Sequence, residues 1–280
     1  MGKIIYGTEV AKDLREKLKD SLANLKEPVH LAVVLVGNNP ASASYVKGKE
    51  KACLEVGIEA TTYHFEEESN QEEVLNKILE LNEDPKVDGI LLQLPLPNHL
   101  DSDCLIQAID PRKDVDGLTI ENIGKLHQRK DTMVPCTPLG IMEILNFLPI
   151  SLEGKHAVVI GRSNLVGAPV ARLLLDRNAT VTICHSKTSH LIEITQTADI
   201  LIVAIGKPQF IKAEHVKEGA VVIDVGINRM ENGKLCGDVD TDSVLNKVSY
   251  VTPVPKGVGP MTITMLLWNT YEAHRRRNHD

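Results

Sequence analysis

The sequence is poor in aromatic residues and in excess positive charge, and both shortages exclude classes of partner. Phe, Trp and Tyr make up 3% of the 280 residues, so a base-stacking surface for single-stranded nucleic acid is not expected. The net charge of -7 at pH 7 also disfavours a polyanionic partner. The one dense basic run, Arg275–Arg277, is interpreted as a solvated helix end that suits the helix dipole. We therefore expect no nucleic-acid partner.

Paired cysteines and long apolar runs are also missing. The five cysteines are scattered and never form a C-x-x-C pair, which fits neither a disulfide framework nor a zinc site and indicates a reducing compartment. No stretch approaches the ~18 apolar residues of a membrane span. The N-terminus alternates charge and leucine and shows no signal-peptide core. We expect a cytoplasmic protein with no membrane partner and no metal.

What the sequence does contain is a regular alternation of apolar runs and amphipathic stretches, which is typical of parallel β-α-β construction. Buried parallel strands are continuously apolar, as "AVVI", "ILIVAI" and "AVVIDV" are. In the first half, strands are predicted at His30–Val36, Ala60–Phe65 and Val87–Leu94, with helices over Glu9–Leu25, Pro40–Val56, Glu72–Leu81 and Asp101–Ile109. In the second half, strands are predicted at His156–Ile160, Thr180–Cys184, Asp199–Ile205, Ala220–Val225 and Ser249–Val251, and helices after the first three.

The two halves are predicted to form separate α/β domains with a cleft between them. A helix over Pro138–Leu148 bridges them, and a last helix over Met261–Arg276 crosses back to the first. The predicted domains are residues 1–142 plus 261–280, with a parallel sheet and the catalytic groups, and residues 143–260, a Rossmann-like domain.

A glycine-containing turn follows the strand His156–Ile160 and precedes a helix. It reads Gly161-Arg162-Ser163-Asn164-Leu165-Val166-Gly167, and such a turn lets backbone N–H groups approach a pyrophosphate. Ser163 stands where the usual G-x-G-x-x-G has its middle glycine, so this turn alone is equally compatible with a tight strand-to-helix connection.

The end of the next strand adds information about the cofactor. Dinucleotide folds place a ribose-reading residue there, and an NAD enzyme would carry Asp or Glu. This sequence instead has Cys184-His185-Ser186-Lys187-Thr188. A basic, hydroxyl-bearing cluster together with Arg162 suits a 2′-phosphate, although a solvated loop of mixed polarity is the alternative. We predict NADP rather than NAD.

A lysine on an inward helix face is the main catalytic candidate. Asn39 and Pro40 open the helix over Pro40–Val56, and steps of about 100° per residue place Lys49 on one arc with Tyr45, Ala52, Cys53 and Val56. An ammonium is costly to bury unless it is paired or neutral. Lys49 is either a snorkelling side chain or an acid/base whose pKa partial desolvation lowers toward neutrality.

Two loops are expected to converge on Lys49, because the carboxyl ends of parallel strands carry the site. Gln93 ends the strand Val87–Leu94 and is either a partnered core amide or a substrate contact. The loop from Asp110 to Leu118 carries three acids, which are either solvated or functional. Their spacing matches no EF-hand, and we reject a metal site.

Taken together, these residues resemble the bifunctional methylenetetrahydrofolate dehydrogenase/cyclohydrolases almost from end to end. The matching segments are "ASYVKGKEKACLEVGI", "DGILLQLPLP", "KDVDG", "VPCTPLGIMEIL", "GKHAVVIGRSNLVGAPVA", "CHSKT", "ADILIVAIGKP", "GAVVIDVGIN", "GDVD" and "TPVPKGVGPMT". The resemblance implies NADP-dependent oxidation of 5,10-methylenetetrahydrofolate and hydrolysis of the methenyl product to 10-formyltetrahydrofolate, by a homodimer. A dehydrogenase with weak or absent cyclohydrolase activity is the alternative, and a folate- or NADP-binding protein without turnover is a third possibility.

The resemblance also implies roles for residues. Lys49 is the acid/base, Tyr45 stacks on the folate, Gln93 contacts Lys49, and Asp116 grips the pterin. Further implied substrate contacts are Leu94, Pro95, Pro255, Gly259 and Pro260, and implied cofactor contacts are Thr137, Gly161, Arg162, Ser163, Val166, Gly167, His185, Ser186 and Ile227. One departure is Lys256, which stands where the family usually has the first glycine of P-G-G-V-G-P.

Overall fold

The computed structural model describes residues 2–277, which form two compact units. Unit 1 comprises residues 2–12 and Thr137–Thr262, and unit 2 comprises Asp13–Cys136 and residues 263–277. Three helices contain the points of division: α1 (Gly7–Leu22), α6 (Cys136–Phe147) and α10 (Val258–Arg277). Among the described residues, no helix is long and apolar enough to cross a membrane.

The units differ from the predicted domains at their ends. Residues 2–12 group with unit 1 because β1 (Lys3–Ile4) pairs in parallel with β11 (Tyr250–Val251). The other division falls at Cys136, six residues before the predicted boundary at 142. Residues 1 and 278–280, which the predicted ranges include, lie outside the described part of the chain.

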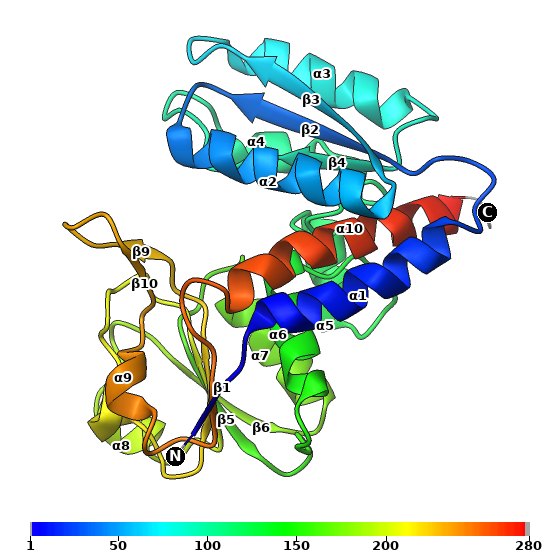
Figure 1. Cartoon of the computed structure of the whole chain (residues 1–280). Helices are drawn as coiled ribbons and strands as arrows, with labels where there is room; N and C mark the ends of the chain where they lie inside the picture. Colours follow the sequence, from blue (N-terminus) through cyan, green and yellow to red (C-terminus); the bar gives the residue numbers. More distant parts are fainter. Residues whose placement is uncertain (1, 278–280) are drawn as a thin grey trace. The chain divides into compact units, whose positions relative to one another are not determined.

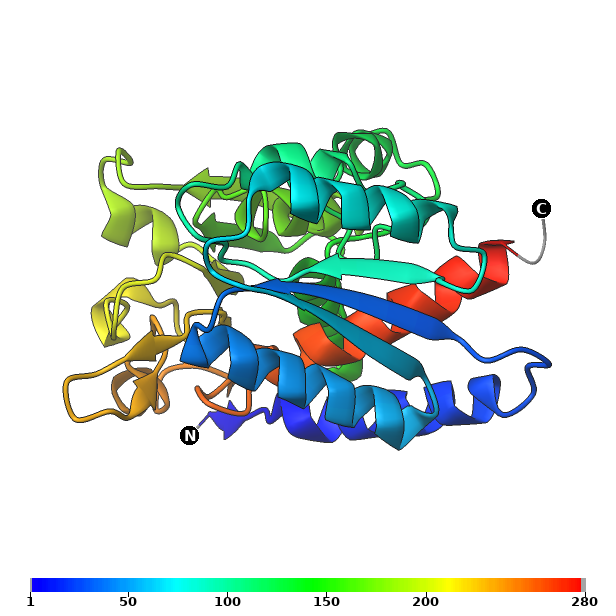
Figure 2. The same cartoon turned by 90° about the horizontal axis from the view of Figure 1, so that it is seen from above.

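Unit 2 is a three-stranded parallel sheet with helices on both faces. The strand order is β3-β2-β4, and Figures 1 and 2 show α2 on one face and α3 on the other. Alternate residues of β2 (Ala32, Val34, Val36) pack against Val74 and Ile78 of α3, because successive side chains of a strand point to opposite faces. The elements are β2 (His30–Val36), α2 (Pro40–Val56), β3 (Glu59–Phe65), α3 (Gln71–Glu83), β4 (Gly89–Leu92), α4 (Ser102–Gln107) and α5 (Ile120–His127).

Unit 1 is built on a six-stranded sheet in the order β1-β11-β8-β7-β5-β6, in which every pairing is parallel. The chain passes from β5 to β6 on one side and returns across β5 to β7, so the strand order reverses beside β5. The strands are β5 (His156–Ile160), β6 (Thr180–Cys184), β7 (Ile200–Val203) and β8 (Val221–Asp224), with a hairpin of β9 (Asn228–Arg229) and β10 (Leu235–Cys236). The helices are α7 (Gly167–Asp176), α8 (Leu191–Thr195), the 3₁₀ turn η1 (Ala213–His215) and α9 (Thr241–Val244).

The predicted two-domain α/β architecture is confirmed, and so are the positions of its main elements. The helix expected after the third strand of the second half is reduced to η1. The strand expected over Val87–Leu94 is shorter, because the chain turns after Leu92 into the proline-containing segment that starts at Gln93. The prediction missed β1, α5, α9 and the β9–β10 hairpin.

Candidate active site

Helix α2 holds Lys49 over the sheet of unit 2. The Asn39 side chain accepts the Ser42 N–H at 3.3 Å, which is the predicted N-cap interaction. The inward face carries Ala52, Cys53 and Val56, all buried, and Lys49 is half-buried among them. An amine at this position is therefore partly removed from water.

Gln93 is the direct partner of Lys49. Its backbone N–H donates to the Val34 carbonyl at 2.9 Å, so the residue continues the line of β4. Its side-chain amide donates through Nε2 to the Leu94 carbonyl at 2.5 Å, which leaves Oε1 facing Lys49. Lys49 Nζ donates to that oxygen at 2.9 Å. Gln93 is 7% exposed, so this amide is a fixed acceptor for the lysine.

The loop that carries Asp116 is organised by its neighbour Asp114. The buried Asp114 carboxylate accepts the Gly117 N–H at 3.0 Å, the Thr119 N–H at 2.7 Å and the Asn122 Nδ2 group at 2.9 Å. Asp114 is thus a structural residue, whereas the Asp116 side chain is half-buried and near Lys49. Within residues 2–277, no group of three or more His, Cys, Asp or Glu is placed to hold a metal.

Burial and charge act against each other on this cluster. Burial lowers the pKa of Lys49, and the nearby Asp116 carboxylate opposes that shift because it favours the ammonium. Burial likewise raises the pKa of Asp116, and Lys49 opposes that shift. The Lys49 amine therefore loses its proton at a lower pH than an ordinary lysine, as a general acid/base near neutrality requires.

Cys136 belongs to the same cluster, although no sequence pattern indicated it. Its thiol donates to the Val115 carbonyl at 3.2 Å, and burial, followed by the charge of Asp116, holds its pKa well above the usual value. It is a neutral donor at the base of the site. Asn269 of α10 fixes the same segment, since its Nδ2 donates to the carbonyls of Val115 at 2.8 Å and Val134 at 2.9 Å.

The expected position of Tyr45 is wrong in one respect. It was placed on the inward arc with Lys49, but its side chain is 44% exposed. By helical angle Tyr45 lies between the buried Ala52 and Val56, but it stands about two turns nearer the start of α2 than Ala52, where its side chain is not covered. Leu94 is half-buried and Pro95 exposed, directly after Gln93.

In unit 1, two predicted cofactor loops leave the same edge of the sheet. Ile160 and Cys184 are register partners in β5 and β6, and the Gly161 N–H donates to the Cys184 carbonyl at 2.9 Å. Arg162 and Ser186 each lie two residues beyond one of these partners, and both are exposed. The loops therefore meet beside the reversal of strand order, where open α/β sheets bind ligands.

Close backbone approach explains the glycines of the first loop. Gly161 has φ of 123°, and a Cβ on it would lie 2.2 Å from the Ala204 carbonyl oxygen. A Cβ on Gly167, the first residue of α7, would lie 2.2 Å from the Gly161 carbonyl oxygen. Ser163 takes the middle position and its hydroxyl accepts the Val166 N–H at 3.2 Å. The second loop is held by the Thr188 hydroxyl, which accepts the His185 N–H at 2.8 Å.

Two buried aspartates, also absent from the predicted site, shape the loops near Ile227. The Asp238 carboxylate accepts the N–H groups of Ile205 at 2.7 Å and Lys207 at 2.8 Å. The Asp224 carboxylate accepts the Asp238 N–H at 2.9 Å, and burial raises the pKa of Asp224 to about 7. These interactions fix a loop on which Ile227 is 48% exposed.

The remaining predicted residues also lie in unit 1. The Thr137 and Thr262 hydroxyls are hydrogen-bonded at 2.9 Å. Pro255 is exposed, and Gly259 and Pro260 are half-buried at the start of α10. Lys256 has φ of 77°, so it occupies the left-handed region that glycine enters more easily, and its side chain is exposed.

Comparison with known proteins connects both units to one family. The sequence family described as "Tetrahydrofolate dehydrogenase/cyclohydrolase, catalytic domain" matches residues 5–116, and "Tetrahydrofolate dehydrogenase/cyclohydrolase, NAD(P)-binding domain" matches residues 135–278. The bifunctional protein FolD of Bacillus anthracis is 55% identical over 276 residues, which cover 98% of this chain and 96% of that protein.

Two solved structures have the same fold. The bifunctional FolD methylenetetrahydrofolate dehydrogenase/cyclohydrolase from Campylobacter jejuni is 48% identical, with a TM-score of 0.97 over 99% of this chain and 100% of that one. The Trypanosoma brucei dehydrogenase-cyclohydrolase, solved with NADP and an inhibitor, is 35% identical, with a TM-score of 0.95 over 100% of this chain and 99% of that one. With the lysine–glutamine–aspartate cluster in unit 2 and the glycine turn in unit 1, the chain belongs to the bifunctional tetrahydrofolate dehydrogenase/cyclohydrolase family.

Proposed function

We propose that the protein oxidises 5,10-methylenetetrahydrofolate with NADP and hydrolyses the resulting 5,10-methenyltetrahydrofolate to 10-formyltetrahydrofolate. The observation that carries this proposal is the Lys49–Gln93 contact of 2.9 Å, next to Asp116 and with the Lys49 pKa lowered by burial.

The residues of unit 1 fit NADP. Gly161 and Gly167 have no side chains, so the backbone segments at the start of α7 lie close together. In dinucleotide folds, the backbone N–H groups at this position bind the pyrophosphate. No acid follows β6, and Arg162 and Ser186 lie at one sheet edge, which suits a 2′-phosphate. NADP held by these residues would supply the acceptor for a hydride from the methylene carbon of the folate. The T. brucei relative solved with NADP supports the same assignment.

In the first step, the protein acts mainly by positioning. Asp116 is suited to accept N–H donors of the pterin ring, and an accepted hydrogen bond of this kind is strengthened by the carboxylate charge. The exposed Tyr45 ring on the first half of α2 offers a surface for stacking. Holding the folate carbon in place supplies a large part of such a barrier.

The second step uses the Lys49 amine. Water adds to the methenyl carbon, and neutral Lys49 accepts one of the protons of that water. As the bond between this carbon and N5 breaks, the ammonium returns a proton to N5, and the other proton of the water goes to solvent. The Gln93 oxygen stabilises the ammonium while it exists, because it accepts from Nζ.

A paired assay tests the proposal. Purified protein is given methylenetetrahydrofolate with NADP or with NAD, while reduced cofactor and methenyltetrahydrofolate are both followed by absorbance. We expect kcat/KM to be higher with NADP and the methenyl species not to accumulate. Accumulation of that species at the rate of cofactor reduction would instead show a dehydrogenase without efficient cyclohydrolase activity, and no turnover would show a binding protein.

We further propose that the protein works as a homodimer in the cytoplasm. All five cysteines are free thiols, which suits a reducing compartment. The seven-residue strand β3 pairs only with β2 among the described residues, so it offers an edge for association. Light scattering should give a mass of twice 30.8 kDa; the mass of a single chain would contradict the dimer.

A further inference from the structure

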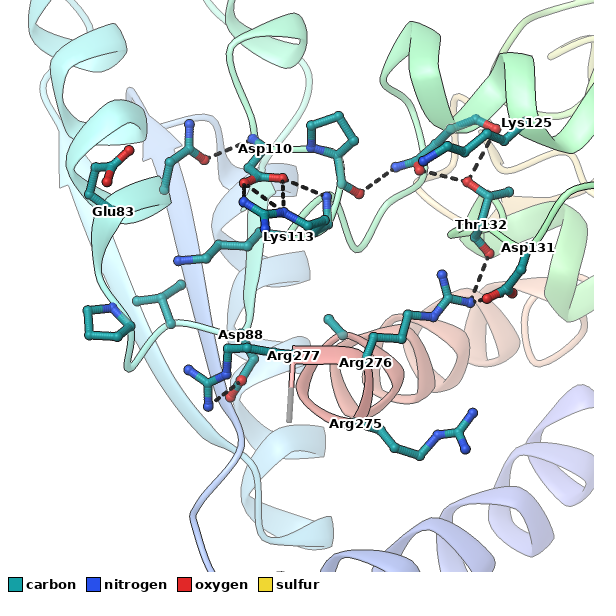
Figure 3. A pocket seen from close by; sticks show the side chains of 17 residues that line it. Glu83, Asp88, Asp110, Lys113, Lys125, Asp131, Thr132, Arg275, Arg276 and Arg277 are labelled. Carbon is teal, nitrogen blue, oxygen red and sulfur yellow. Dashed lines mark hydrogen bonds and ion pairs between the residues drawn. The ribbon is translucent and has the colours of Figure 1, made fainter. Parts of the chain in front are cut away.

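Unit 2 contains a cavity that the proposed reaction does not use. It has a volume of ≈ 600 Å³ and is lined by the end of α3, the loop from Asp110 to Lys113, and the end of α10 (Figure 3). Asp88 lines it just before β4, whereas Gln93 follows β4. The cavity and the Lys49 cluster therefore belong to opposite ends of that strand and share no lining residue.

The walls of this cavity are rich in charged side chains. Six cationic side chains line it against four acidic ones, Glu83, Asp88, Asp110 and Asp131. Three of the cations also pair with acids outside the lining: Lys125 with Glu121, Arg275 with Glu272 and Arg277 with Glu27. The helix dipole explains why arginines are found at the end of α10. It does not explain why cations from other segments line the same cavity. The six are Arg112, Lys113, Lys125, Arg275, Arg276 and Arg277.

Acidic partners hold several of these cations in place. Arg276 and Arg277 leave the end of α10 in different directions (Figure 3). Arg276 Nη2 lies 2.7 Å from Asp131 Oδ1, and Arg277 Nη2 lies 3.0 Å from the buried Asp88 Oδ1. Across the cavity, Lys113 Nζ donates to the carbonyls of Leu81 and Asp84. The positive groups are thus positioned before any ligand arrives, which lowers the entropy cost of binding.

One donor in this wall is unsatisfied. Arg277 Nε is buried and has no hydrogen-bond partner within residues 2–277. Buried polar groups nearly always have partners, so a buried donor without one is available to a ligand. A guanidinium offers five N–H donors in a fixed fork, and the Arg277 contacts to acids use Nη2.

We propose that this cavity is a binding site for a compact polyphosphate, either inorganic or at the end of a nucleotide. Its volume falls within the usual range for small-molecule sites, about 300–1,000 Å³. Its cations come from the loop at Arg112 and Lys113, from α5 at Lys125, and from the end of α10. A tetrahedral phosphate accepts hydrogen bonds from several directions, whereas a planar carboxylate is best matched by one guanidinium in its plane.

Calorimetric titration of the full chain with sodium triphosphate tests the site, with saturating NADP present to occupy unit 1. Parallel titrations use ATP, inorganic phosphate and triglutamate. We expect one equivalent of triphosphate or ATP per chain and weaker binding of the other two. Equal affinities for triphosphate and ATP would show that the site recognises the phosphates alone. A higher affinity for ATP would show that it also recognises the nucleoside. No binding of either, or tighter binding of triglutamate, would overturn the proposal.

Two matched double variants distinguish binding in this cavity from a general effect of the protein's net charge. Lys125→Gln/Arg276→Gln removes two lining cations whose acidic partners, Glu121 and Asp131, are exposed. Lys19→Gln/Arg177→Gln removes one exposed lysine and one exposed arginine elsewhere. Triphosphate affinity should fall at least tenfold in the first variant and change less than twofold in the second, with dehydrogenase rate and melting temperature unchanged in both. Equal losses in the two variants, or no loss in the first, would show that the cavity is not the site.

Discussion

Replacing Gln93 with leucine tests the role assigned to the contact with Lys49. Leucine fills a similar volume at this 7%-exposed position but cannot accept from Lys49 Nζ, which lies 2.9 Å from Oε1. A hydrogen bond to a charged group contributes about 1.5–3 kcal/mol, and here the charge exists while Lys49 holds the proton of the attacking water. The hydrolysis rate should therefore fall about 10- to 150-fold, at 1.36 kcal/mol per factor of ten.

The assay for this variant starts from purified methenyltetrahydrofolate and follows its disappearance, so that hydrolysis is measured without the first step. Formation of NADPH from methylenetetrahydrofolate should change less than about threefold, since that step depends on positioning. The control is Gln128→Leu, the same change at an exposed position directly after α5 in unit 2. Equal losses of both activities in Gln93→Leu, or hydrolysis at the normal rate, would refute the role of Gln93.

Three further changes probe the rest of the site. Lys49→Met should reduce hydrolysis by about 10²- to 10⁴-fold while leaving measurable hydride transfer and an unchanged circular dichroism spectrum; parallel loss of both activities would show that Lys49 is not specific to hydrolysis. Asp116→Asn should weaken folate binding about 10- to 150-fold. Because Asp116 raises the pKa of Lys49, the limb of the hydrolysis profile that rises with pH should also move to lower pH, and a shift to higher pH would contradict the assigned sign. Gly161→Ala should destabilise the fold by about 2 kcal/mol or more and lower the melting temperature by about 4–8 °C, with a higher KM for NADP; an unchanged melting temperature would show that the turn relaxes.

Local patterns were sufficient to select the candidate residues that lie on single elements. The period of α2 identified Lys49, and the Asn39 cap placed the start of that helix. Gln93 was found because a polar residue ended an apolar strand. Helix α5 was missed although Thr119 provides an N-cap signal, since its side chain accepts the Asn122 N–H.

Interactions between distant residues were beyond the reach of such patterns. β1 has two residues, and its ladder partner in the described part of the chain, β11, lies about 250 residues away in sequence. Asn269 fixes the Asp116 loop across a separation of 154 residues, and nothing in the sequence links the two. Tyr45 was predicted to be buried, because helical angle alone does not show how far along the helix neighbouring residues cover the inward face. The organising roles of Asp114 and Asp224 depend on backbone N–H groups that only the folded loops bring together.

The division of α1, α6 and α10 between the units has a consequence for attempts to simplify the molecule. Neither half is encoded by one continuous stretch of gene. A fragment ending at Cys136 would keep Lys49, Gln93 and Asp116 but lose the amide of Asn269 that ties down the carbonyls of Val115 and Val134. A working folate half would have to be made by rejoining the C-terminal helix to that fragment through a designed connection.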